Sequence, residues 1–447
     1  MNEIEENIEE NWEAREALQL NEQIGLLDAN ARHLVDQGLH DDAERVYREM
    51  SRLSPNNLAA IHYLATRHLA RGELEEAQRL IERGVRLDFG TAVWHQHLGI
   101  VLRARDYLRG ALRAFDQALN LNPKLAVAWI QRGDVLHAMG RKEEGIASYV
   151  YAGTLLGNLV NAAADAPPKT SRSLRRAGEI VCRERTRMLA DTLQPVRDRH
   201  DREALNRAEA SVFGVIRGER PDYADPLQKP TGFYFPGLAP QPFFEQSDFS
   251  FAHTLKEHSA QITHEIRGLL AEHPSPFEEA PRGPDQTSGD FANSSAYYFY
   301  RQGERREEAA LRCPETMAAI EELPLAQLPV RLPEVLFFGL DPRERIPPQH
   351  GFSNFTLQVL LPLIASRGCG TKTGDLTRVW TPGEALIFDA SYEHESWNRA
   401  GEPAVALAFT IWHPELTQAE RDYLIAAFAG LENFTLKYLS LQSSDSP

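Results

Sequence analysis

Residues 24–159 repeat at a fixed interval, and this periodicity limits the fold of the chain more than any other feature. One position recurs every 34 residues, at Gly38, Gly72, Asp106 and Gly140. Two further positions hold small residues: one is occupied by Ala31, Ala65, Gly99 and Gly133, and the other by Ala43, Ala77, Ala111 and Gly145. A third position holds a large apolar residue, namely Tyr47, Ile81, Phe115 and Tyr149. Small residues let two helices approach closely, bulky residues fill the space to the next repeat, and Pro55 and Pro123 end the second helix. The pattern therefore predicts four stacked helix pairs.

This pattern resembles the tetratricopeptide repeat, whose unit is a helix pair of 34 residues. The resemblance implies an α-solenoid over residues 24–159 with a concave groove that captures a peptide or protein partner. A groove of this kind also serves as a spacer or as a dimerisation element. The sequence leaves both interpretations open.

The segments on either side of the repeats differ from them in composition. Residues 1–23 form an acidic N-terminal segment, and residues 160–231 are interpreted as a linker followed by a helical adaptor. Within the latter, residues 161–173 are rich in Pro, Ser and small residues, which is typical of a linker. Residues 174–218 have helical periodicity that Pro195 is expected to interrupt. Their arginines alternate with Glu and Asp, which favours a solvated helix face over an anion site.

The composition of the whole chain is that of an ordinary globular protein. A length of 447 residues is enough for two or three domains. The residues are 42% hydrophobic and 25% charged. The net charge of −16 argues against nucleic acid as a partner, since phosphate binding needs a basic surface. No apolar run reaches the ~18 residues of a membrane span, and the acidic start differs from a signal peptide, so we expect a cytoplasmic protein without a membrane partner. Cys182, Cys313 and Cys369 lie far apart and predict reduced thiols.

The C-terminal part, residues 232–447, contains many short β-type runs separated by turn residues. Such runs predict a jelly-roll or cupin-like barrel, so the chain as a whole is expected to be a multidomain protein of mixed α and β structure. Thr417 and Glu420 form a capping-box pattern that predicts a closing helix. Between residues 384 and 416, two β-type runs flank His394, and we interpret them as a hairpin that presents one imidazole. By itself, a histidine at a strand end is more often structural than a ligand.

The wider motif resembles a known enzyme family. The sequence FDASYEHESWN followed by a strand ending in WHPEL is similar to the signature of the aspartyl/asparaginyl β-hydroxylases. The resemblance extends over about residues 233–428 and includes FYFPGLAPQPFFEQ (233–246), CPET (313–316), PPQHGFSNFTLQVLLPLI (347–364) and CGTKTGDLTRVW (369–380). It implies a double-stranded β-helix that uses iron(II) and 2-oxoglutarate to hydroxylate a side chain.

The resemblance also implies a set of metal ligands. The family uses two histidines, with a glycine where other oxygenases have a carboxylate; His394 matches the second histidine and Gly351 the glycine. An ungapped alignment places Gln349 at the first ligand position and His350 one residue later. A shift of one residue reverses the face of a strand, although a turn or bulge restores it. The candidate metal ligands are therefore His394 and His350, and which of Gln349 and His350 faces the metal is left open.

The clamp that the family uses for the distal carboxylate of 2-oxoglutarate is replaced in this sequence. Its two arginines, its histidine and its serine align with Ala404, Gln358, Leu360 and Phe338. Lys372 and Arg378, on a neighbouring segment, are the candidates for a relocated clamp, although basic residues at a barrel mouth are more often surface pairing partners.

Three functional interpretations follow. The first is a repeat scaffold whose oxygenase-like domain binds or regulates and has an altered, inactive site. The second is an active dioxygenase that hydroxylates an Asp-like or Asn-like side chain of a peptide or protein. The third is other small-molecule or metal-dependent chemistry in the same barrel.

Overall fold

The structure of the chain is a computed structural model that describes residues 2–157, 159–164, 166, 168–272, 276–279 and 295–443. It consists of two compact units, Met1–Val181 with Lys437–Pro447, and Cys182–Leu436. In the described residues, no helix has both the length and the apolar character needed to cross a membrane.

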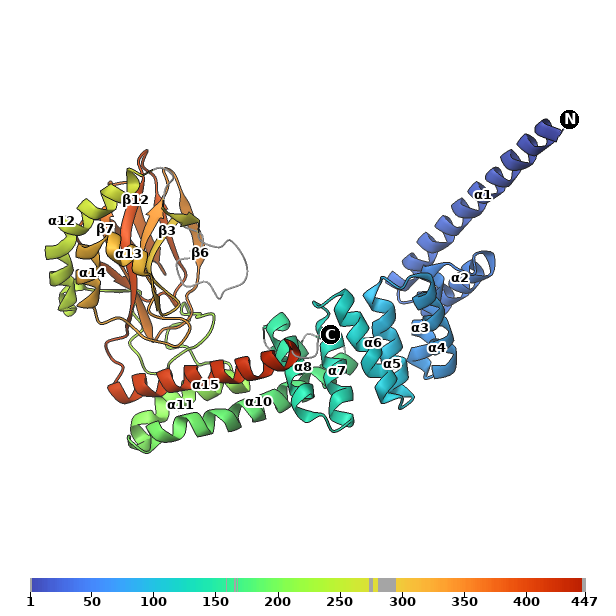
Figure 1. Cartoon of the computed structure of the whole chain (residues 1–447), viewed down its shortest axis with the longest axis horizontal. Coiled ribbons are helices and arrows are strands. Elements are labelled where there is room, and N and C mark those ends of the chain that lie inside the picture. Colours follow the sequence, from blue (N-terminus) through green and yellow to red (C-terminus); the bar gives the residue numbers. More distant parts are fainter. Residues whose placement is uncertain are drawn as a thin grey trace. The chain divides into compact units, whose positions relative to one another are not determined.

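The first unit is built from helices (Figure 1). Its helices are α1 (Asn2–Asp36), α2 (His40–Leu53), α3 (Leu58–Arg71), α4 (Leu74–Leu87), α5 (Ala92–Ala104), α6 (Leu108–Leu121), α7 (Ala126–Ala138), α8 (Lys142–Leu156) and α9 (Leu159–Ala164). The end of α1 pairs with α2, and α3 to α8 form three further antiparallel pairs. The predicted solenoid of four helix pairs is confirmed.

The small positions of the repeat are where two helices of a pair touch. A Cβ atom added to Gly99 would lie 2.7 Å from the ring of Phe115, and one added to Gly133 would lie 2.4 Å from the ring of Tyr149. Ala77 and Ala111 are fully buried. The aromatic residue of the second helix therefore packs directly on the backbone of the first, within one helix pair and not toward the next repeat as expected, while the small positions allow the close approach that the register predicts.

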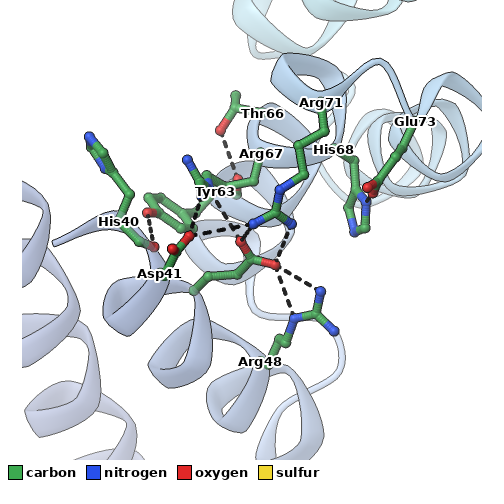
Figure 2. A network of polar contacts seen from close by, with 10 residues as sticks. His40, Asp41, Arg48, Tyr63, Thr66, Arg67, His68, Arg71 and Glu73 are labelled. Carbon is green, nitrogen blue, oxygen red and sulfur yellow. Dashed lines mark hydrogen bonds and ion pairs between the residues drawn. The ribbon is translucent and has the colours of Figure 1, made fainter. Parts of the chain in front are cut away.

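A network of charges joins the first two repeats (Figure 2). Glu44, on α2, has only 7% of its side chain exposed and accepts hydrogen bonds from three arginines. Arg71 donates at 2.6 and 2.9 Å, Arg48 at 2.8 Å and Arg67 at 3.2 Å. These hydrogen bonds, led by those of Arg71, lower the pKa of Glu44 to about 2. A buried carboxylate is tolerated here because it is fully paired.

Helix α10 (Pro168–Arg197) passes from the first unit to the second. It contains Pro195 and ends two residues later, so the proline lies in the last turn. Helices α9 and α10 cover most of the segment that the composition assigns to a linker. In the second unit, α10 and α11 (Arg202–Arg217) pack with α15 (Gln418–Ser443) around Leu193, Val212 and Tyr423.

The second unit contains two antiparallel sheets. The larger has the order β1-β10-β7-β12-β5-β3-β2, with β4 paired to β3, and the smaller has the order β6-β11-β8-β9. The strands are β1 (Phe243–Phe244), β2 (Glu278–Glu279), β3 (Ser295–Arg301), β4 (Glu304–Arg305), β5 (Val335–Leu340), β6 (Arg345–Gln349), β7 (Thr356–Ile364), β8 (Cys369–Thr373), β9 (Leu376–Val379), β10 (Leu386–Phe388), β11 (His394–Asn398) and β12 (Ala404–Trp412). Helices α12 (Phe251–Leu270), α13 (Glu307–Arg312) and α14 (Pro314–Glu321) cover the outer face of the larger sheet (Figure 1).

The two sheets enclose an apolar core to which both contribute. Alternate residues of β7 and β12, such as Leu360 and Ala406, join Ile346 and Trp380 from the smaller sheet and its border. The residues between them, such as Leu361 and Leu407, face the covering helices instead. The structure thus has the predicted double-stranded β-helix architecture, with an interior face and an exterior face on each sheet.

One sequence-based prediction about this region is wrong. The two β-type runs that flank His394 do not form a hairpin: β10 and β12 both pair with β7, and β11 lies between them in the chain but in the other sheet. The predicted capping box is confirmed, because Thr417 N donates to the Glu420 carboxylate at 2.9 Å and Glu420 N donates to the Thr417 hydroxyl at 3.3 Å.

Candidate functional site

His394 opens strand β11 and lies on the interior face of the smaller sheet. Its register partners are Thr373 on β8 and Gln349 on β6. The side chain is 5% exposed, and its ring lies 5.5 Å from that of Phe388 on the larger sheet. The histidine therefore sits between the sheets, as an interior ligand requires.

Both candidate histidines are held in the same tautomer. The Nδ1 atom of His394 lies 3.1 Å from the carbonyl of Tyr392, and that of His350 lies 3.0 Å from the carbonyl of Ser391. A carbonyl oxygen only accepts, so each Nδ1 must carry the proton and donate it. In the neutral ring this places the lone pair on Nε2 of both imidazoles, which is one of the two forms in which histidine binds a metal.

Gln349 and His350 are neighbours with different surroundings. Gln349 is the direct register partner of His394, whereas His350 follows the end of β6 and bonds to the 389–392 turn. The structure thus brings His350 and His394 to the same turn through their backbone hydrogen bonds.

Gly351 has no room for a larger side chain. A Cβ atom at this position would lie 2.7 Å from the Cβ atom of Ala390 and 3.0 Å from its carbonyl oxygen. A carboxylate is sterically excluded here. Within the described ranges, no group of three or more His, Cys, Asp or Glu side chains is arranged to hold a metal ion.

The positions that align with the family clamp line the barrel interior. Phe338, Leu360 and Ala404 belong to the apolar core between the sheets and are at most 4% exposed. Gln358 is 2% exposed, and its Nε2 has no hydrogen-bond partner within the described part of the chain. The interior at these positions offers one amide and no charge.

The two candidate clamp cations lie elsewhere. Thr371 and Thr373 are fully buried on the interior face of β8, so Lys372 between them points to the exterior, the same face as its register partner Glu395. Arg378 on β9 is about half exposed and forms an ion pair with Glu245 at 2.7 Å. The structure does not bring Lys372 to the face that carries His394.

Sequence reasoning missed a buried acid beside this site. Asp389 is 1% exposed and accepts hydrogen bonds at 2.8 Å from Ser391 N and from Gln228 Nε2. Burial raises the pKa of Asp389 to about 7, against these hydrogen bonds, which lower it. In the sequence, Asp389 could have been identified as the second residue of the motif FDASYEHESWN. No sequence signal pointed to Gln228.

Comparisons with known proteins agree with this architecture. The family described as Aspartyl/Asparaginyl beta-hydroxylase matches residues 256–414, and the family described as Tetratricopeptide repeat matches residues 34–97. Human aspartyl/asparaginyl beta-hydroxylase is 30% identical over 143 residues, which cover 32% of this chain and 19% of that protein. The ornithine lipid ester-linked acyl 2-hydroxylase of Rhizobium tropici is 26% identical over 176 residues, which cover 38% of this chain and 60% of that protein.

The matches span only part of these relatives, from 19% to 60% of their length. A crystal structure of MamA covers 34% of this chain and 93% of that protein at 21% identity, with a TM-score of 0.28.

Proposed function

We propose that this chain, in which one segment matches tetratricopeptide repeats and another matches the aspartyl/asparaginyl β-hydroxylase family, is a scaffold that binds a peptide or protein partner. In this proposal the repeats supply the groove, and the hydroxylase-like domain keeps a two-histidine metal site but does not hold 2-oxoglutarate. The observation that carries the proposal is the apolar barrel interior at Phe338, Leu360 and Ala404, where the family resemblance expects a charged clamp.

The tautomers of the two histidines suit a divalent metal. Each imidazole donates Nδ1–H to a backbone carbonyl, an arrangement that fixes ring orientation at metal sites and raises ligand basicity. Nε2 of His350 and of His394 would hold the ion, and iron(II) bound there would supply oxygen activation once further ligands completed its coordination. Two imidazoles without a carboxylate form a weak site.

The distal carboxylate of 2-oxoglutarate does not fit the interior. A carboxylate that leaves water without a cation or hydrogen-bond donors costs several kcal/mol. Gln358 offers one neutral amide donor. Lys372 belongs to the exterior face, and Arg378 is engaged with Glu245. In the described residues, the aligned interior positions therefore supply no charge that would offset this cost.

The alternative is an active 2-oxoglutarate-dependent dioxygenase that hydroxylates an Asp-like or Asn-like side chain of a peptide or protein. The tautomers of His350 and His394 favour this function. It requires Lys372 or Arg378 to act as a relocated clamp, and Arg378 would have to leave Glu245 to do so.

Anaerobic titration of the full chain with iron(II), with and without 2-oxoglutarate, tests the proposal. We expect weak iron binding that is lost in His394→Ala and is little enhanced by 2-oxoglutarate. With iron(II), ascorbate and a peptide library, we expect little release of succinate. The matched control is His413→Ala, since His413 is also buried but lies after β12 and outside the turn 389–392.

Robust succinate release would overturn the proposal if His394→Ala abolished it and Lys372→Ala or Arg378→Ala also did so. That result would establish the dioxygenase and place its clamp on the smaller sheet.

A further inference from the structure

The segment 225–232 is joined by hydrogen bonds to both parts of the chain that carry the two histidines. On one side, Lys229 N donates to the Ser391 carbonyl at 2.8 Å, and Tyr392 OH donates to Asp225 Oδ2 at 2.9 Å. On the other side, Thr231 N donates to the Gly351 carbonyl at 2.9 Å. The segment lies upstream of residue 256, where the match to the family begins.

We infer that residues 225–232 form a positioning strap that holds the turn 389–392 through the contact between Gln228 and Asp389, and so sets the orientation and tautomer of His350 and His394 for metal binding. The inference rests on the proposed two-histidine metal site and names the residues that prepare it. Gln228 and Asp389 are positioning residues, since neither donates directly to an imidazole.

The chain of contacts begins at the buried carboxylate. Asp389 accepts from Gln228 Nε2 on one oxygen and from Ser391 N on the other, each at 2.8 Å. Gln228 is 1% exposed and also forms an isolated β-bridge with Tyr392. The turn 389–392 is thereby fixed from both sides.

The same turn supplies the acceptors for both imidazoles. The Ser391 carbonyl accepts from His350 Nδ1 at 3.0 Å and the Tyr392 carbonyl accepts from His394 Nδ1 at 3.1 Å. The Ser391 carbonyl also accepts from Lys229 N of the strap, and a carbonyl has lone pairs for two donors. If the turn moved, both imidazoles would lose the acceptors that select their tautomer.

The Gln228 side chain allows the positioning of the turn 389–392 to be tested separately from the negative charge of Asp389. Its Oε1 atom has no hydrogen-bond partner within the described residues. In Asp389→Asn, rotation of the Gln228 amide would turn Oε1 toward the new Asn amide and restore the contact. In Asp389→Leu and Gln228→Leu the hydrogen bond between the two side chains cannot form again, because leucine has no polar side-chain atom.

The experiment uses the full chain labelled with ¹⁵N-histidine. Long-range ¹H–¹⁵N spectra of the metal-free protein at pH 8 report the tautomers of His350 and His394, and calorimetric titration with Mn²⁺ reports metal affinity. We expect wild type and Asp389→Asn to keep the Nδ1–H tautomer at both histidines. In Gln228→Leu and Asp389→Leu, we expect a mixture of tautomers at His350 and a loss of Mn²⁺ affinity of about tenfold or more.

Thr316→Val is the matched control. Thr316 is fully buried in α14, and its hydroxyl donates to Glu265 at 2.5 Å, so the variant loses a buried hydrogen bond far from the turn. We expect a lower melting temperature with unchanged tautomers and Mn²⁺ affinity.

The outcomes separate the strap from the proposed function. Unchanged tautomers in Gln228→Leu, with only the melting temperature reduced as in Thr316→Val, would overturn the strap. If Asp389→Leu does not fold, the tautomers in Gln228→Leu test the strap in its place. If the strap variants change the tautomers but wild type binds no Mn²⁺, the strap stands and the proposed metal site fails.

Discussion

Replacing Glu44 by Gln removes the negative charge that three arginines share, and one of its two acceptor oxygens, while keeping the shape of the side chain. The hydrogen bonds from Arg71, Arg48 and Arg67 lower the pKa of Glu44 from 4.5 to about 2. At 1.36 kcal/mol per pKa unit, this corresponds to roughly 3 kcal/mol of stabilisation. The arginine side chains are 23% to 52% exposed, so solvent screening reduces the expected loss to about 2 kcal/mol.

The dependence on pH has a definite sign. Because the pKa of Glu44 is lower in the folded state, its contribution is fully present above about pH 4.5 and is lost as the pH falls toward 2. The stability difference between wild type and Glu44→Gln should therefore be constant above about pH 5 and shrink below it.

Hydrogen exchange measured by mass spectrometry on the full chain gives the local free energy of opening of α2 and α3. We expect faster exchange in both helices of Glu44→Gln and no change in the strands of the second unit. Asp42→Asn is the control, since Asp42 and Arg45 form an exposed pair on the same helix. An equal effect of the two substitutions, or a difference that does not depend on pH, would refute the argument that the buried network stabilises this contact.

Three other perturbations have defined outcomes. Gly133→Ala should destabilise the fourth repeat by about 1–3 kcal/mol in thermal unfolding because its Cβ would lie 2.4 Å from the Tyr149 ring, whereas Gly25→Ala, with nothing within 4 Å, should be neutral or stabilising. Burial raises the pKa of Asp389 to about 7, so its ionisation makes the folded state less stable as the pH rises from about 4 through 7, and denaturant titrations of Asp389→Asn should lack this loss. Gln358→Arg should lower the melting temperature because it buries a cation. 2-Oxoglutarate should restore stability in this variant but have little effect on wild type, and equal effects on both proteins would contradict the proposed absence of a clamp.

The repeats could be predicted from sequence in detail because their contacts are local and periodic. The spacing of 34 residues alone identified Gly99 and Gly133 as contact positions, and the structure places aromatic rings on both. Pairs between repeats follow the same spacing: Arg71 bonds Glu44, and Arg105, one repeat later, bonds Gln78 at 2.6 Å. Such pairs are visible only once the register is known, because their partners are 27 residues apart.

The barrel was less predictable because its contacts are not local. The second β-type run that the sequence shows after His394 is a strand in the structure, β12, since a continuous apolar run is sufficient for that assignment. Its partner was not predictable, because apolar character does not specify which strand lies next to it. The chain crosses to the other sheet between β10 and β11, and this crossing invalidated the expected hairpin.

At the site, residue types were easier to predict than their orientations. The motif identifies His394 and His350. The acceptors that fix their tautomers are backbone carbonyls, which every residue has, so the sequence does not reveal them. Gln228 lies 161 residues from Asp389, its partner, so no local pattern links them.

The two halves of the site differ in what their chemistry requires. The orientation of the two histidines depends on hydrogen bonds to the turn 389–392, and the chain forms these hydrogen bonds by itself. The co-substrate side depends on a cation to offset the burial of a carboxylate, and the interior at Leu360 and Ala404 supplies none. At about 1.4 kcal/mol for each tenfold change in affinity, a penalty of several kcal/mol weakens binding of a dicarboxylate by a factor of a hundred or more. A neutral ligand or partner side chain does not incur this penalty, so in the proposed function the same interior discriminates against 2-oxoglutarate while His350 and His394 remain available to a metal.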